Sequence, residues 1–112
     1  FTSDFNEGWG AVLNESMNSG CAVVVSRAIG AAPFLIKNGE NGLLFDNNED
    51  LYHSVCTLLK NHLLRESMGK MAYKTMIQKW NAENAARKLL DVVSGNCERT
   101  VCCDDDEPMS KV

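Results

Sequence analysis

Hydrophobic residues recur at helical spacing at the beginning of the chain and again throughout its second half. The first such stretch follows a turn at residues 4–10, runs for about ten residues and ends at Ser19-Gly20. Gly20 suits a C-terminal cap, because glycine accepts the left-handed backbone that such caps need. Glu15 lies off the hydrophobic stripe of this helix. The residues expected to face the core are Trp9, Val12, Leu13 and Met17.

Two short apolar runs predict strands. Cys21 to Val25 is apolar throughout, which is typical of a parallel strand covered on both faces. Residues 30–37 predict a loop with a short helix, closed by a turn at Asn38-Gly39, and Gly42 to Phe45 predicts a second, shorter strand. Helices that alternate with apolar strands favour an α/β fold with parallel strands and flanking helices. Two strands are too few for such a sheet, so we expect further strands upstream in a longer chain.

The second half of the chain predicts three consecutive helices. Asn48 is the expected N-cap of the first, with Glu49 and Asp50 in its opening turn, and Asn81 is the expected N-cap of the third. The expected core positions are Leu51, Val55, Leu58 and Leu59 in the first helix, Leu64, Met68, Met71, Ala72, Thr75 and Met76 in the second, and Ala82, Ala85, Ala86, Leu89, Leu90 and Val93 in the third.

The periodic pattern stops at Ser94. Residues 1–93 are therefore predicted to form one domain fragment, and residues 94–112 an acidic, disordered tail. The 112-residue chain has a formal net charge of −4 and no basic stripe, which argues against a nucleic-acid partner. It has no apolar run near the roughly 20 residues that cross a bilayer and no visible signal peptide, although a targeting signal could lie further upstream.

The five cysteines do not form a recognisable disulfide or metal framework. Cys21 in a strand and Cys56 on a helix are expected to be buried thiols in a reducing cytosol. The tail cysteines Cys97, Cys102 and Cys103 lie beside an acidic run, but their spacing matches no structural zinc site, so no metal is predicted. His53 and His62 are expected at the surface.

The chemically suggestive segment is the glycine-rich turn between two acids, Glu7 and Glu15. The turn opens a helix, where outward-pointing amides and the helix dipole favour an anion, and Gly10 allows close approach to the backbone. The flanking carboxylates would be good acceptors for sugar or ribose hydroxyls. The combination suggests a phosphorylated, hydroxyl-rich ligand such as a sugar nucleotide. From composition alone, an ordinary loop-to-helix turn with surface acids explains the same residues.

The segment Ser3 to Gly20 also resembles the E-x7-E region of the retaining glycosyltransferases of group 1 (family four). The strand ending in Val25-Ser26, then Gly30 and the turn Gly39-Glu40-Asn41-Gly42-Leu43-Leu44, follow in the order and spacing of that family, and the resemblance extends to about Val93. It implies the GT-B fold of two Rossmann-like domains. This chain would be part of the C-terminal, donor-binding domain, without the domain that binds the acceptor.

The resemblance also implies roles for individual residues. Glu15 would accept hydrogen bonds from the ribose. Glu7 would be the catalytic residue, holding the hydroxyls of the transferred sugar and steadying positive charge that develops at the anomeric carbon. The backbone of Gly8, Trp9, Gly10, Ala11 and Val12 would bind the diphosphate of a UDP- or GDP-linked sugar, without a metal or cofactor. The phosphate-binding Arg and Lys of such enzymes lie upstream, so the chain alone is expected to be inactive.

Further implications concern the full-length enzyme. It would transfer a hexosyl unit to a glycan or lipid-linked acceptor in surface polysaccharide synthesis, in the cytoplasm and at the inner face of the membrane. The alternative is a non-catalytic Rossmann-like module that binds a nucleotide or a protein. Phe34 stands where the family commonly has Glu, which affects donor preference. Trp9 could be a platform for a sugar ring, but its place on the apolar stripe favours a core residue.

Overall fold

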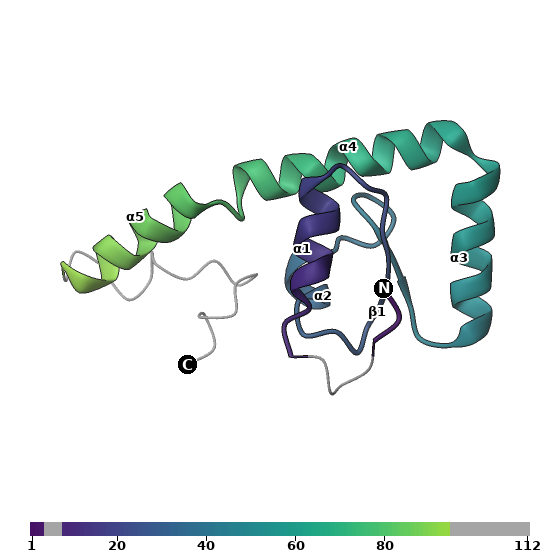
Figure 1. Cartoon of the computed structure of the whole chain (residues 1–112), viewed down its shortest axis with the longest axis horizontal. Helices are drawn as coiled ribbons and strands as arrows, with labels where there is room; N and C mark the ends of the chain where they lie inside the picture. The colour runs from purple at the N-terminus through teal and green to yellow at the C-terminus, as the bar shows by residue number, and fades with distance from the viewer. Residues whose placement is uncertain (4–7, 95–112) are drawn as a thin grey trace.

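The computed structural model describes residues 1–3 and 8–94. Its helices and strands follow the predicted order, with alternating helices and strands first and three helices after them (Figure 1). The elements are α1 (Ala11–Asn18), β1 (Val24–Ser26), α2 (Ala32–Leu35), β2 (Leu43–Phe45), α3 (Asn48–Lys60), α4 (His62–Gln78) and α5 (Ala82–Val93).

The two strands form a parallel pair, as expected from their apolar sequences. Val24 lies opposite Leu43 and Ser26 opposite Phe45. Phe1 lies along the other edge of β1, where its α-amino group donates to the Val24 carbonyl and its own carbonyl accepts from Ser26. Burial lowers the pKa of this α-amino group, because the charged form is poorly solvated there. β1 therefore has a hydrogen-bonded neighbour on both sides within the described residues.

The first strand begins later than predicted. Cys21 belongs to the end of α1. Its amide donates to the Ser16 carbonyl and the Gly20 amide donates to the Met17 carbonyl, each at a distance of 3.0 Å. With a φ of +73° at Gly20, this is the Schellman motif, so the predicted glycine cap is confirmed. The same geometry leaves Cys21 exposed and outside β1, and the prediction of a buried thiol there is wrong.

One side chain covers the outer edge of β2. The Leu44 amide points away from β1, because successive amides of a strand alternate in direction and that of Leu43 donates to Val23. Asn38 Oδ1 accepts the hydrogen bond from this Leu44 amide at 2.8 Å. The predicted turn at Asn38-Gly39 is present, with a φ of +87° at Gly39.

The core lies between α1, the two strands, α2 and one side of α4. Leu13, Met17, Val25, Leu35 and Ala72 are all at most 1% exposed. α4 crosses the end of α1 (Figure 1) so closely that a Cβ at Gly69 would lie 2.2 Å from the Gly20 carbonyl oxygen. The contact requires glycine in α4.

Several predicted core positions are exposed. Val12 is 53% exposed, because it is one residue, or about 100° of helix, away from the buried Leu13–Met17 line. In α4, Met68, Ala72 and Met76 are buried as predicted, whereas Met71 is 39% exposed. The prediction that both Val12 and Met71 face the core is therefore wrong.

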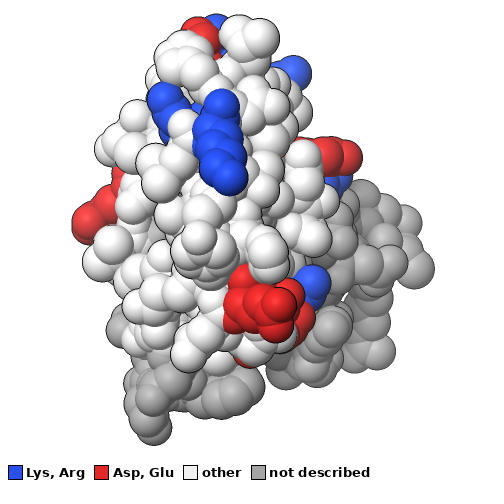
Figure 2. All heavy atoms as spheres, turned by 90° about the vertical axis from the view of Figure 1, so that its right-hand side faces the viewer, with Lys and Arg blue, Asp and Glu red and all other residues white. Residues whose placement is uncertain are grey.

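The N-cap of α3 lies one residue earlier in the chain than predicted. The N-cap is Asn47, whose side chain accepts from the Asp50 amide, and Asn48 is the first helical residue. Only one side of α3 faces the strands, so Leu58 is buried while Leu59 is 69% exposed and Val55 is also exposed. Cys56 is half-buried, and His53 and His62 are exposed as predicted. Figure 2 views this side of the molecule, where acidic and basic side chains, several of them side by side, are scattered over a largely uncharged surface.

α5 contributes no buried side chain. Its N-cap is Asn81, as predicted, with the Asn81 side chain accepting from the Asn84 amide. The helix extends away from α1 (Figure 1), and the prediction that its apolar face is part of the core is wrong for the described residues. Among residues 1–3 and 8–94, no helix combines the length and apolar character needed to cross a membrane.

Candidate functional site

The glycine-rich turn ends at Gly10, the N-cap of α1. Gly10 has a φ of +87°, and a Cβ there would lie 2.7 Å from Ile29 Cγ2 and 3.2 Å from the Phe1 ring. The position therefore requires glycine both for its backbone conformation and for space. No side chain caps the helix at Gly10, so its first turn presents backbone amides without a competing side-chain acceptor at that residue.

The loop that follows β1 supports this turn from behind. The Ala31 amide donates to the Trp9 carbonyl at 3.0 Å. A Cβ at Gly30 would lie 2.3 Å from the Gly8 carbonyl oxygen, so the two backbones touch directly. Gly30, which the sequence marked only by its spacing, is thus needed for the packing of the candidate site.

Three of the predicted site residues share one exposed face of α1. Ala11 and Glu15 are four residues apart, and Val12 lies three residues before Glu15, so all three are neighbours on the helix surface. All three are exposed. Among the described residues, no ion pair involves the Glu15 carboxylate. The arrangement places a carboxylate one helical turn after the amides that open α1.

Glu7, the predicted catalytic residue, lies outside the described residues. Its distance from Glu15 is therefore not part of the described geometry. Gly8 is exposed, and Trp9 and Gly10 are half-buried and buried. The binding role of residues Glu7 to Val12 and of Glu15 stays a prediction.

Trp9 packs its ring inward while its backbone forms the turn. The indole contacts the Phe34 ring, with centroids 5.9 Å apart, and the Trp80 ring at 5.5 Å. Its Nε1 donates to Asn14 Oδ1 at 3.1 Å, and the side chain packs against the core. This supports the interpretation of Trp9 as a core residue, rather than as a platform for a sugar ring.

The strand ends add a cation that the sequence analysis did not single out. Arg27 directly follows β1 and pairs with Asp46, which directly follows β2, at 3.0 Å between Nε and Oδ2. Ligands of parallel α/β sheets bind at the carboxyl ends of the strands, so this pair stands at the edge where a ligand is expected. The signal was available in the sequence, because Asp46 is the first residue and Arg27 the second after a predicted strand.

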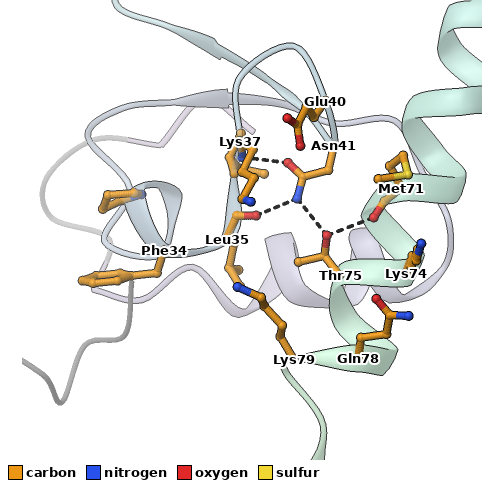
Figure 3. Close-up of a pocket in the computed structure, with 12 residues that line it drawn as sticks. Phe34, Leu35, Lys37, Glu40, Asn41, Met71, Lys74, Thr75, Gln78 and Lys79 are labelled. Carbon is orange, nitrogen blue, oxygen red and sulfur yellow. Dashed lines mark hydrogen bonds between the residues drawn. The ribbon is translucent and has the colours of Figure 1, made fainter. Parts of the chain in front are cut away.

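A separate cavity of about 240 Å³ lies between α2 and α4 (Figure 3). Its rim carries Lys37, Lys74, Lys79 and Glu40, and none of the predicted site residues lines it. Asn41 forms its floor: the buried side chain donates to the Leu35 carbonyl and to Thr75 Oγ1, and accepts from the Lys37 amide. These bonds fasten the turn before β2 to α4.

No group of three potential metal ligands occurs among residues 1–3 and 8–94. The tail cysteines Cys97, Cys102 and Cys103 lie outside the described residues. Of the predicted disordered tail, residues 94–112, only Ser94 is among the described residues.

Comparison with known proteins connects this geometry to a family. The family model of glycosyl transferases group 1 matches residues 1–75. Among solved structures, the chain is similar to the C-terminal domain of a glycosyl transferase group 1 family protein (LpcC) from Francisella tularensis, with 29% identity and a TM-score of 0.59. The similarity covers 68% of this chain and 40% of that one, and confirms the predicted fold class. No match is found among curated proteins.

Proposed function

Since the chain belongs to the glycosyl transferases of group 1, we propose that its Gly8–Val12 turn and Glu15 bind a nucleotide diphosphate sugar. The observation that carries this proposal is the exposed face of α1, where Glu15 stands one turn above an N-terminus capped by a glycine. The amides of the turn bind the diphosphate, and the helix dipole stabilises its charge. The Glu15 carboxylate accepts hydrogen bonds from both ribose hydroxyls.

Glu7 holds the hydroxyls of the transferred hexosyl unit and stabilises positive charge that develops at the anomeric carbon. Retention of configuration rests on the resemblance to family four. The diphosphate is the leaving group, so amides aimed at it stabilise the charge that increases on it as the glycosidic bond breaks. This needs no metal or cofactor from the chain.

The remaining parts of the reaction belong to a longer enzyme. The chain spans 40% of the length of the similar solved chain. A glycan or lipid-linked acceptor would bind to an N-terminal domain that this chain does not contain, and cations for the diphosphate would come from upstream residues. We therefore expect the chain alone to bind a UDP- or GDP-linked donor without transferring its sugar. Surface polysaccharide synthesis at the cytoplasmic face of the membrane is the setting we propose.

The competing function is a non-catalytic nucleotide-binding or protein-binding module. The exposed apolar face of α5 favours it, because such a face suits a protein partner. A thermal melt of the chain with UDP, GDP, ADP and ATP at millimolar concentration separates the two. A donor site is stabilised by one nucleoside diphosphate more than by ATP. A ligand present at 100 times its dissociation constant raises the free energy of unfolding by about 2.7 kcal/mol over that of the ligand-free chain.

Glu15→Ala tests the ribose contact. We expect it to weaken binding of the stabilising diphosphate by roughly 1–3 kcal/mol, since a hydrogen bond to a charged group is lost. Glu83→Ala, which removes an exposed carboxylate from α5, is the matched control and should leave the affinity unchanged. Equal affinities for the Glu15→Ala variant and the unmodified chain would contradict the ribose role, and stabilisation by no nucleotide would favour the binding module.

A further inference from the structure

Three aromatic side chains from separate segments meet beside the glycine-rich turn. Trp9 comes from the turn itself, Phe34 from α2, and Trp80 from the connection between α4 and α5. The Trp9 and Phe34 rings are nearly parallel, with 21° between their planes, and the Trp9 and Trp80 rings are tilted by 44°. All three are half-buried. Trp9 contacts both of the other rings, and Trp9 and Trp80 also pack against the core.

Trp9 is held at both its side chain and its backbone. The indole donates to Asn14 of α1, and the carbonyl accepts from Ala31. The residues on either side, Gly8 and Gly10, have no side chains that could anchor them. Within residues 8–10, Trp9 is therefore the residue whose side chain and backbone together hold the turn in place.

Trp80 lies two residues before the first residue of α5. Its amide donates to the Met76 carbonyl at the end of α4, and Asn81, the next residue, caps α5. α5 itself buries no side chain, so Trp80 is where the segment that leads into α5 is fastened to the core. Its ring contacts Trp9 directly.

We propose that Trp80 is a positioning residue for the glycine-rich turn, and that the α4–α5 connection sets the orientation of the Gly8–Val12 amides through the Trp80–Trp9 contact. In a chain that binds a donor as proposed above, a movement of α5 that shifts Trp80 changes the affinity for the diphosphate. Phe34, which stands where the family commonly has an acid, completes the aromatic support of Trp9. This inference rests on the proposed function for its ligand, but the coupling between the two segments does not.

Hydrogen exchange of the Leu13 and Ala31 amides measures the coupling without any ligand, because both amides donate hydrogen bonds to carbonyls of the turn. Trp80→Ala should accelerate exchange there by roughly two- to tenfold, the factor expected from loss of one aromatic pair. Trp80→Phe keeps an aromatic ring and should restore slow exchange. Tyr73→Ala is the matched control, because Tyr73 is an aromatic residue of α4 that lies beside Asn18–Gly20, at the other end of α1. It should leave exchange of the Leu13 and Ala31 amides unchanged.

The same variants are then titrated with the diphosphate that stabilises the unmodified chain. Trp80→Ala should weaken binding by a similar factor, and Trp80→Phe and Tyr73→Ala should not. Unchanged exchange of the Leu13 and Ala31 amides in folded Trp80→Ala would overturn the coupling, whatever the chain binds. Uniformly faster exchange in all helices would show a loss of global stability and would also overturn it. If exchange changes as expected but no nucleotide binds the unmodified chain, the proposed function fails and the coupling stands.

Discussion

Gly10 meets two separate physical demands. Its left-handed backbone is costly for any residue with a Cβ, and the space in which that Cβ would lie is filled by Ile29 and Phe1. Gly39 shares the same φ of +87° but has open space around it. The two glycines therefore form a natural pair for separating backbone strain from steric overlap.

We expect Gly10→Ala to lower the free energy of unfolding by about 2–4 kcal/mol, because strain and overlap add. Gly39→Ala should cost only about 1 kcal/mol, from the backbone strain alone. Urea unfolding of both variants measures the difference. Equal losses would show that Ile29 and Phe1 can move aside, and that the close packing behind the turn is not needed for folding.

Residue-level predictions from the sequence succeeded where local geometry decides. The exposure of Glu15 and the cap at Gly20 follow from helical spacing and from the backbone freedom of glycine. The contacts of Trp9 with Phe34 and Trp80 could not be predicted, because they join residues 25 and 71 positions apart in the chain. Val12 was mispredicted because an apolar side chain at the border of a stripe can face either the core or solvent.

At the scale of elements, the pattern of apolar residues was enough to predict the four longer helices and both strands, while capping chemistry set their limits. α3 begins after Asn47, because this residue is the one whose side chain reaches the Asp50 amide. The predicted cap, Asn48, lies one position too far along the chain for that bond. The prediction that the first strand begins at Cys21 is wrong for a related reason, because the Cys21 amide is still used by the cap of α1.

Exchanging the two asparagines for alanine tests this assignment. Asn47→Ala should destabilise the protein by about 1 kcal/mol, because the first turn of α3 loses its side-chain acceptor. Asn48→Ala should change stability by less than about 0.5 kcal/mol, since Asn48 is an exposed helical residue. Thermal unfolding of both variants is the measurement, and a larger loss for Asn48→Ala would mean that the predicted cap was right.

For the whole molecule, stability comes from the region between α1 and α4, and α5 contributes little to it. Leu13 is 1% exposed, whereas Leu90 is 67% exposed. The sequence could not reveal this difference, because both leucines lie on well-formed apolar stripes. What a stripe packs against depends on neighbours that are not encoded within the helix itself.

Matched leucine truncations measure this difference. Leu13→Ala should cost about 2–5 kcal/mol through the cavity that it leaves in the core. Leu90→Ala should change the free energy of unfolding by no more than about 0.5 kcal/mol. Both values come from denaturant unfolding of the chain. A loss of several kcal/mol for Leu90→Ala would show that α5 packs against the domain in solution.

The hydrogen bond from the Leu44 amide to Asn38 has a consequence for self-association. A free strand edge invites a strand from a second molecule, and this recruitment begins the growth of aggregates. On β2 the outward amide is already occupied by a side chain from the preceding turn. An incoming strand would have to displace that side chain before it could pair, so Asn38 protects the open side of a very short sheet from polymerisation.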